Sequence, residues 1–440
     1  MLVTSGEHYG AVINREFDYV AYLDELARHR LNLTRIWVGP YREVRGDFSI
    51  ANNSLAPHPA AFIAPWPRGA TPGAADGATR FDLSRWNPEY FARLRTFIKA
   101  AEKRRIVVEV SLFCPYYEDS MWKVSPFNAT NNVNGVGDVP RTEVLTLKHS
   151  DLVAVQDAMV RRIVVELQRF DNIYYEICNE PYFGGVTLEW QWHVAGVIAE
   201  AEQSLPARHL ISQNVANGSV KIDGPDPRIS ILNFHYSRPP ESVDMNYSLD
   251  RAIGNNETGF DGSADSTYRI QGWEFLMAGG ALYNSLDYSF TVGHERGDYS
   301  PDAKTPGGGT TALREQLRFL REFFDHIPFI DMSPSNEVIQ RGIPEGASAR
   351  VLARLGKEYA IYLCHTRLTN DPGTHFTVDG KKRRVSLAVD LPPGSFESTW
   401  LNTKTGSKDN RVRFSHPGGT RMVESPLYSE DVALRIRSTR

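Results

Sequence analysis

Residues 172–181 read NIYYEICNEP, an apolar and aromatic run that ends in Asn179, Glu180 and Pro181. A short run of this kind, bounded by turn-forming residues, is typical of a strand that is buried on both faces. Amphipathic helical patterns precede it at 151–170 and follow it at 187–205. Because strands that alternate with helices pair in parallel, this stretch predicts one unit of a parallel α/β sheet.

The same alternation of strand and helix extends on both sides of this unit. Strand-like segments lie at 2–12, 33–39, 105–113, 172–180, 209–217, 229–237, 252–259 and 281–290. Eight such units predict a (β/α)8 TIM barrel that ends near Ile327. The link at 218–228 is too short for a full helix, so one unit must be abbreviated. The alternative is an open doubly wound sheet, but that fold prefers a glycine-rich first turn, which SGEHYG at 5–10 is not.

The pattern changes near Asn336. Short alternating strands joined by turn residues follow to the end of the sequence, as in YAIYLCHT, VSLAVDLPPG and VALRIRS. This pattern is typical of a small antiparallel β-sandwich. We therefore expect a barrel domain over 1–335 and a C-terminal β-sandwich domain over 336–440.

The composition excludes several classes of protein. The 440 residues are 41% hydrophobic and 23% charged, which are ordinary values for a globular protein. The 49 basic and 53 acidic residues give a net charge of −4, so we expect no nucleic-acid partner and no anionic membrane partner. The cysteines, Cys114, Cys178 and Cys364, are far apart and odd in number, which excludes a disulfide framework and a CxxC zinc motif.

Neither a membrane span nor an export signal is visible. The sequence has no run of 18 or more apolar residues, which a transmembrane helix would need. The opening MLVTSGEHYG has no basic segment followed by an apolar one. The default expectation is a cytoplasmic location, with a trimmed secreted protein as the open alternative.

Polar residues end the predicted strands. In a (β/α)8 barrel the carboxyl ends of the strands form one rim, where the βα loops open. The side chains expected on this rim are Glu7, His8, Tyr9, Arg35, Trp37, Cys114, Tyr116, Asn179, Glu180, Gln213, Asn214, His235, Tyr236, Asn256, Glu257, Asp287 and Tyr288. Carboxylates, amides and aromatic rings suit a sugar, which needs hydrogen bonds at its edge and an aromatic surface at its apolar face. We therefore expect an oligosaccharide or glycoside as the partner.

Two of these carboxylates predict a reaction. Glu180 ends the fourth strand and Glu257 ends the seventh, so only the fold can bring them together. Two carboxyl groups across a sugar cleft are the minimum apparatus for glycoside hydrolysis. If their oxygens lie about 5–5.5 Å apart, the reaction retains the anomeric configuration through a covalent glycosyl-enzyme.

Asn179-Glu180-Pro181 on strand four, with Glu257 closing strand seven, resembles the clan A glycoside hydrolases, which are retaining barrel enzymes. The resemblance covers about residues 1–330. It implies that Glu180 is the acid/base, that Glu257 is the nucleophile and that Asn179 bonds the sugar 2-hydroxyl. It also implies that Arg35, His235 and Tyr236 hold the nucleophile and its sugar ring.

The sequence departs from the clan at strand eight. The clan usually closes its sugar pocket there with a tryptophan, whereas this strand offers Asp287 and Tyr288. We expect both to contact substrate, together with Glu7, His8 and Trp37. Trp122, on the long loop 115–149, is the best candidate for a further sugar platform.

The mechanism requires the two glutamates to differ in charge. Arg35 beside Glu257 would favour an ionised nucleophile, whose charge would then keep Glu180 protonated. The predicted activity is retaining hydrolysis of β-linked hexosides or α-L-arabinofuranosides, without a metal or other cofactor. A transglycosylase on the same site and a catalytically silent carbohydrate-binding protein stay open, as does the oligomeric state.

Overall fold

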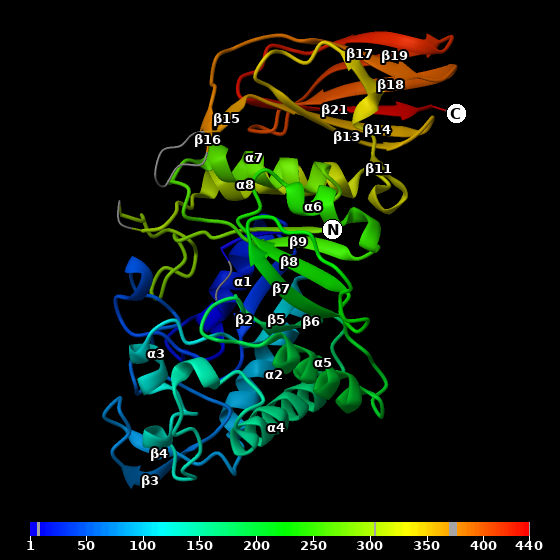
Figure 1. The fold of residues 1–440 in the computed structure, drawn as a ribbon. Coiled ribbons are helices and arrows are strands. Elements are labelled where there is room, and N and C mark those ends of the chain that lie inside the picture. The colour runs from blue at the N-terminus through cyan, green and yellow to red at the C-terminus, as the bar shows by residue number, and fades with distance from the viewer. Residues whose placement is uncertain (7–8, 303–304, 369–375, 440) are drawn as a thin grey trace.

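The computed structural model describes residues 1–6, 9–302, 305–368 and 376–439. Its N-terminal part is a parallel sheet of eight strands in the order β1-β10-β9-β8-β7-β6-β5-β2, curled into a barrel (Figure 1). The strands are β1 (Leu2–Ser5), β2 (Leu33–Trp37), β5 (Val107–Phe113), β6 (Ile173–Cys178), β7 (Ile211–Asn217), β8 (Ile231–His235), β9 (Ala252–Glu257) and β10 (Leu282–Ser285). The predicted (β/α)8 barrel is confirmed.

Asn32 links the first two strands of the barrel. Its side-chain oxygen accepts a hydrogen bond from the Val3 N–H at 2.8 Å, and its own N–H donates to the Val3 carbonyl at 3.1 Å. These bonds join β1 to the residue preceding β2, where the two outermost strands of the sheet meet.

Helices cover the outside of the barrel. They are α1 (Tyr19–Arg28), α2 (Pro88–Glu102), α4 (Ser150–Leu167), α5 (Leu188–Glu202), α7 (Asp265–Met277) and α8 (Thr311–Asp325). Helix α2 begins as its sequence predicts, because the Asn87 side chain caps the Glu89 N–H and Pro88 occupies the first helical position. No helix forms over the described residues 218–230 between β7 and β8, which confirms the abbreviated unit.

The inside of the barrel is layered. One apolar layer contains Leu33, Tyr174, Ile231 and Leu282, contributed by alternate strands. Two residues further along the same strands are Arg35, Glu176, Asn233 and Asn284, all buried. The barrel centre below the rim is therefore polar, although the strands read as largely apolar.

Two long βα loops carry short elements of their own. The loop after β2 carries β3 (Arg68–Pro72) and β4 (Thr79–Phe81), and the loop after β5 carries α3 (Asp119–Val124). A third loop, after β8, carries α6 (Glu241–Asn246). Single 3₁₀ turns lie at η1 (Tyr9–Ala11), η2 (Asp47–Ser49), η3 (Ala129–Asn131), η4 (Arg141–Glu143), η5 (Tyr247–Leu249), η6 (Phe329–Asp331) and η7 (Asn336–Val338). No described helix has the length and apolar character needed to cross a membrane.

The C-terminal part is the predicted β-sandwich. A six-stranded sheet, β11-β13-β14-β21-β18-β19, packs through an apolar core against the three-stranded sheet β12-β17-β20. The strands of the two sheets are β11 (Ser333–Pro334), β12 (Ile339–Arg341), β13 (Ser348–Arg354), β14 (Glu358–Cys364), β17 (Ser386–Leu391), β18 (Gly394–Leu401), β19 (Lys408–His416), β20 (Gly419–Glu424) and β21 (Asp431–Ser438). Strands β15 (Thr366–Leu368) and β16 (Phe376–Val378) pair with each other in a separate two-stranded sheet. The division at residue 335 stays our proposal.

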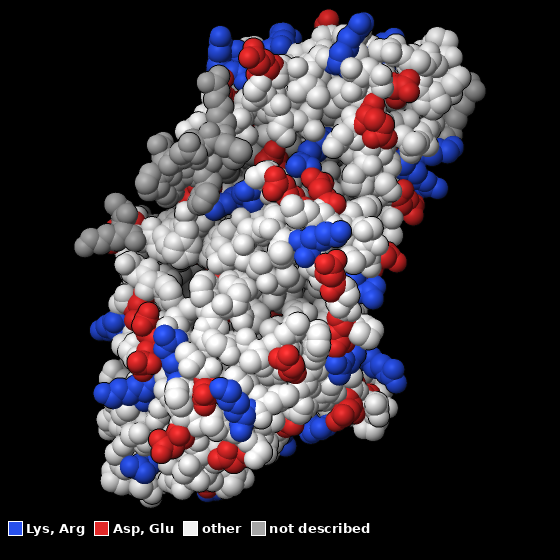
Figure 2. Space-filling model, in the orientation of Figure 1, with Lys and Arg blue, Asp and Glu red and all other residues white. Residues whose placement is uncertain are grey.

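Helices α7 and α8 lie between the barrel and the sandwich (Figure 1). Trp273 of α7 stacks on Tyr362 of β14 with ring centroids 5.2 Å apart, and Arg269 pairs with Asp431 at 2.8 Å. The sandwich is therefore packed on the barrel through buried contacts. On the face shown in Figure 2, basic and acidic side chains are interspersed, in keeping with the small net charge.

Candidate active site

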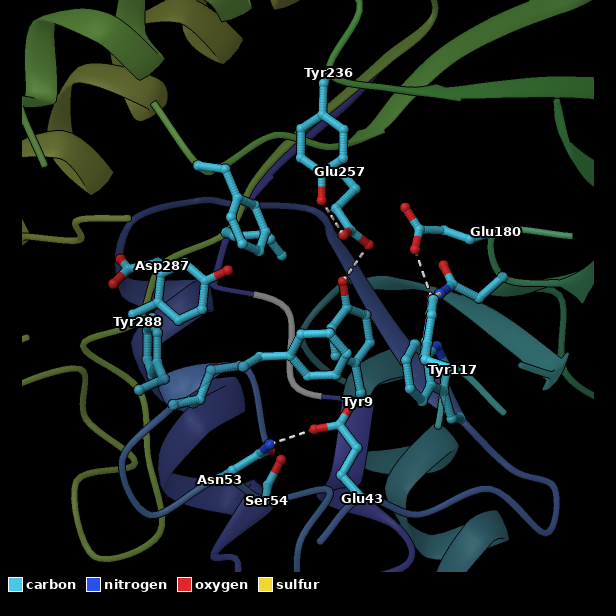
Figure 3. A pocket seen from close by; sticks show the side chains of 17 residues that line it. Tyr9, Glu43, Asn53, Ser54, Tyr117, Glu180, Tyr236, Glu257, Asp287 and Tyr288 are labelled. Atoms are coloured by element: carbon cyan, nitrogen blue, oxygen red, sulfur yellow. Dashed lines mark hydrogen bonds between the residues drawn. The ribbon is translucent and has the colours of Figure 1, made fainter. Parts of the chain in front are cut away.

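A pocket opens at the carboxyl ends of the barrel strands. Its walls are rich in aromatic rings, and four carboxylic side chains line it (Figure 3). The aromatic residues are Tyr9, Trp37, Phe48, Tyr117, Tyr236, Phe260, Tyr288 and Phe290, and the acidic ones are Glu43, Glu180, Glu257 and Asp287. The pocket thus combines a few polar groups with apolar walls, as small-molecule sites usually do.

Glu257 is the last residue of β9, and three donors hold its carboxylate. Tyr9 Oη donates to Oε2 at 2.8 Å and Tyr236 Oη donates to Oε1 at 2.7 Å. Arg35 Nη1 lies 3.1 Å from Oε2. Charge-assisted bonds of this kind fix the orientation of the carboxylate.

Glu180 follows β6 and faces the same pocket. Tyr117 Oη donates to its Oε2 at 2.6 Å and Tyr182 Oη donates to its Oε1 at 3.2 Å. Its backbone φ is +36°, in the left-handed region that a non-glycine residue rarely adopts. Such strained backbone is concentrated at functional sites, where the surrounding structure maintains it.

His235, at the end of β8, lies between the two glutamates. Its Nδ1 is 3.1 Å from Glu180 Oε1 and 3.6 Å from Glu257 Oε2. One ligating atom from each of the three residues lies within 4.8 Å of the others. The two carboxylates are therefore close neighbours across the pocket, although 77 residues separate them in the chain (257 − 180 = 77).

The charges around His235 differ from the expectation for Glu180. Burial would raise the pKa of Glu180, but the hydrogen bond and charge of His235, with Tyr117 and Tyr182, outweigh it and lower that pKa. Burial would lower the pKa of His235, but the charge of Glu257 and the bond to Glu180 raise it above its ordinary value. Both shifts favour placing the shared proton on His235 rather than on Glu180. The expectation that Glu180 is protonated did not take into account His235, a base that lies beside it.

Arg35 connects the pocket to the barrel centre. Its Nη2 donates to Asn179 Oδ1 at 2.7 Å and to Glu176 Oε2 at 2.5 Å, and its side chain is buried. Asn179 Nδ2 in turn donates to Tyr117 Oη at 2.9 Å. The guanidinium group thus orients Asn179 as well as Glu257, and the Asn179 side chain lines the pocket.

Apart from Trp122, the remaining residues that are predicted to contact substrate fall into three groups. Trp37 and Tyr288 line the pocket, and the Trp37 ring stacks on Tyr9 with centroids 4.4 Å apart. Asp287 also lines it, but its carboxylate accepts from Ser5, Ser289 and Arg314. Glu7 and His8 lie outside the described residues.

Trp122, the predicted sugar platform, lies outside the pocket around Glu180 and Glu257. Its Nε1–H donates to the Val139 carbonyl at 3.0 Å, and its ring packs on Tyr116 with centroids 4.9 Å apart. The ring therefore packs within its own loop and does not line the pocket around Glu180 and Glu257.

Several pocket residues were not predicted. Tyr117 and Tyr182, the two tyrosine donors to Glu180, lie in loops, each four residues past the end of its strand, β5 or β6. Glu43, Phe48 and Asn53 come from the long insertion after β2. The two tyrosines could have been found by extending each strand end a few residues, whereas no sequence signal indicates which part of an insertion folds inward.

The Glu180, His235 and Glu257 cluster also has the residue types of a metal site. Its donor atoms, however, are bonded to one another and to Tyr9, Tyr117, Tyr236 and Arg35. The Arg35 guanidinium already supplies a positive charge beside Glu257, which disfavours a second cation there.

Neither a protein-family model nor a curated protein sequence matches the chain. Solved structures do resemble it. A putative glycoside hydrolase from Bacteroides vulgatus superposes with a TM-score of 0.67 at 16% identity, over 100% of this chain and 79% of that one. A glycoside hydrolase family 5 protein from the same organism gives 0.62 at 12% identity, over 100% and 89%. An endo-β-1,4-mannanase from Thermotoga petrophila gives 0.50 at 12% identity, over 98% and 96%. At these identities the likeness shows that the chain shares the fold of these proteins.

Proposed function

We propose that the protein is a retaining glycoside hydrolase in which Glu257 is the nucleophile and Glu180 the general acid/base. The observation that carries this proposal is the approach of their carboxylate oxygens to within 4.8 Å across an aromatic pocket. Retaining enzymes keep their two carboxyl groups about 5–5.5 Å apart, and inverting enzymes about 6.5–9.5 Å. The similarity in fold to several glycoside hydrolases also supports it.

In the first step, Glu257 attacks the anomeric carbon while the glycosidic C–O bond breaks. His235 passes its proton to Glu180 across their 3.1 Å hydrogen bond, and the leaving oxygen then takes this proton from Glu180, which is left as a carboxylate. Tyr9 and Tyr236 hold the attacking carboxylate in position. The products are a covalent glycosyl-enzyme and a free alcohol.

In the second step, the charges reverse. Ester formation neutralises Glu257, so Arg35 is left with Glu176 as its close anionic partner. Glu180, now a carboxylate, removes a proton from a water molecule, and the water oxygen attacks the anomeric carbon. The Glu257 ester bond breaks, and the sugar leaves with its original configuration.

The substrate class that we propose is a β-linked hexoside or an α-L-arabinofuranoside. Four exposed aromatic side chains lie near Glu180 and Glu257, namely Phe48, Tyr182, Phe183 and Phe260. Rings at this position would receive the apolar face of a sugar or an aryl leaving group.

The test is a screen of aryl glycosides with proton NMR of the first anomer released. We expect the retained anomer, and release of the inverted anomer would overturn the mechanism. High concentrations of a sugar acceptor would reveal transglycosylation instead. A protein that binds sugars but turns over none would be the catalytically silent alternative.

Azide assigns the two roles. With an activated aryl glycoside, azide should rescue Glu257→Gly and yield the glycosyl azide of inverted configuration. The matched variant, Glu180→Gly, should yield the azide of retained configuration, because azide then attacks the intact glycosyl-enzyme. Exchanged configurations would reverse the assignment.

A further inference from the structure

Glu43 is a buried carboxyl group in the pocket that the proposed mechanism does not use. It lies in the insertion between β2 and α2, and only 6% of it is exposed. In Figure 3, Glu43, Asn53 and Ser54 lie across Tyr9 from Glu257 and Glu180. The pocket thus has a polar end away from the paired glutamates.

The insertion holds Glu43 in a defined orientation. Its backbone N–H donates to the Leu55 carbonyl at 2.8 Å, and Tyr41 Oη donates to its Oε1 at 3.2 Å. Asn53 Nδ2 donates to Oε2, while Asn53 Oδ1 accepts from the Leu55 N–H at 2.9 Å. The bond to Leu55 fixes the orientation of the amide and directs its N–H group at Glu43.

This environment favours the neutral acid. No ion pair to Glu43 occurs among the described residues, and the charged or titratable groups that face it are Asp47, Tyr41 and Glu257. Burial raises the pKa of Glu43 to about 8, although the bonds from Asn53 and Tyr41 oppose the shift. Near neutral pH the group therefore carries a proton to donate as well as oxygens that accept.

A sugar ring in this pocket would extend from Glu180 and Glu257 toward Glu43. The Tyr9 ring lies between Glu257 and Glu43 (Figure 3), and the Trp37 ring stacks on it. With its anomeric carbon at Glu257, the ring would direct its remote hydroxyl groups toward Glu43 and Asn53. A carboxylate on the sugar would instead share the pocket with the Glu180 and Glu257 carboxylates, which like-charge repulsion disfavours.

We propose that Glu43 is a specificity-determining residue, which hydrogen-bonds a hydroxyl group of a neutral sugar ring whose anomeric carbon faces Glu257. This inference rests on the proposed function and adds a substrate class to it. Neutral glycosides should be accepted, and uronides should be rejected. Asn53 acts as a positioning residue through its bond to Glu43.

The test compares the parent enzyme with Glu43→Ala and Glu43→Gln. Each is assayed on the best aryl glycoside from the screen and on a series in which each analogue lacks one hydroxyl group. For one analogue the parent should lose about tenfold or more in kcat/KM. Glu43→Ala should lose a similar factor on the full substrate but little more on that analogue, because the partner is already absent. Glu241→Gln, at an exposed glutamate of α6, is the matched control and should follow the parent.

A second readout separates recognition from structure. The affinity of the parent for the neutral product sugar, measured by calorimetry, should change as the pH rises through about 8 and Glu43 ionises. Glu43→Gln cannot ionise and should lack this dependence. If Glu43→Ala does not fold, Glu43→Gln and the deoxy series still decide the question.

The outcomes distinguish the two proposals. The role of Glu43, but not the proposed function, would be overturned by either of two results. One is that the losses in kcat/KM from Glu43→Ala and from removal of a hydroxyl group add for every analogue. The other is that the affinity of the parent does not change with pH. A parent protein that hydrolyses no glycoside would overturn the proposed function itself.

Discussion

Two pairs of glutamates lie one above the other in the barrel. One pair lines the pocket, and the other is surrounded by hydrogen-bond donors of the protein. Glu180 and Glu257 stand at the rim and line the pocket. Glu109 of β5 and Glu176 of β6 lie in the barrel centre and are fully buried. Arg35 contacts both pairs, at 3.1 Å from Glu257, 2.5 Å from Glu176 and 3.6 Å from Glu109.

The interior pair is enclosed by protein donors. Asn256 Nδ2 lies 3.0 Å from Glu176 Oε1, and Asn233 Nδ2 lies 2.7 Å from Glu109 Oε1. Burial and the charge of Glu176 raise the pKa of Glu109 above its ordinary value. Two close carboxylates thus form a structural network where protein surrounds them, and a candidate active site where one side faces a cavity.

The sharpest test makes the same substitution, Glu→Gln, once in each pair. Glu257→Gln should lower kcat by about 10⁴-fold or more, because the amide cannot form the glycosyl-enzyme. Its free energy of unfolding should change by less than about 1 kcal/mol. Glu176→Gln removes the carboxylate closest to Arg35, so it should cost about 3 kcal/mol of stability and only roughly tenfold in kcat.

Turnover on an aryl glycoside and chemical denaturation measure the two effects. The control is Glu241→Gln, at an exposed position. A folded Glu176→Gln protein as inactive as Glu257→Gln would show that the interior pair takes part in the reaction, and the distinction between the layers would fail.

Within the rim pair, Glu180→Gln should discriminate between leaving groups. For a glycoside with a poor leaving group, kcat/KM should fall by about 10²–10⁴-fold, since the departing oxygen lacks its proton donor. For an activated dinitrophenyl glycoside, kcat/KM should fall far less. Equal losses on both substrates would contradict the acid role of Glu180.

The sequence predicts the barrel well because its strands are bounded by clear turn residues and helix caps. NIYYEICNEP places Glu180 at a strand end, and the eight strand ends bring Glu257 to the same rim. The interior glutamates were missed because a largely apolar strand predicts burial and says nothing of buried hydrogen-bond partners. Glu176 lies within such a strand, and its partners come from β2, β5 and β9.

The loops are where sequence reasoning fails in this protein. The length of the loop 115–149 indicates Trp122 as a sugar platform, but it says nothing of the contacts that Trp122 makes with Val139 and Tyr116 in that loop. Glu43 and Asn53 reach the pocket from a long insertion with no regular periodicity. Their positions depend on tertiary contacts such as the bond between Glu43 and Leu55, which no local pattern encodes.

His235 lies between the two rim glutamates, and His235→Gln should have a moderate effect on stability and on kcat. The raised pKa of His235 means that its stabilising contribution is full below pH 6.5 and is lost as the pH rises through the folded-state value. The lowered pKa of Glu180 means that its contribution is full above pH 4.5 and is lost as the pH falls through the folded-state value. The stability difference between parent and variant should therefore be largest between pH 4.5 and 6.5.

The same variant should lose about tenfold in kcat, and the alkaline limb of its kcat/KM profile should move to lower pH, because Glu180 alone then holds the proton. Thermal unfolding and initial rates from pH 4 to 9 measure both effects. A pH profile identical to that of the parent would show that His235 does not share the catalytic proton.

The smallest effect on turnover is expected at Asp287, the strand-eight residue that the sequence predicts to contact substrate. Figure 3 shows its carboxylate directed away from Glu257, and Arg314 Nη1 lies 2.7 Å from Oδ2 in a fully buried ion pair. Asp287→Asn should therefore leave KM and kcat within about twofold of the parent values but cost about 3 kcal/mol of stability. Arg314→Gln should cost a similar amount, and the double variant less than the sum, because both changes break one pair. A large rise in KM with unchanged stability would instead place Asp287 with the substrate-binding residues of the rim.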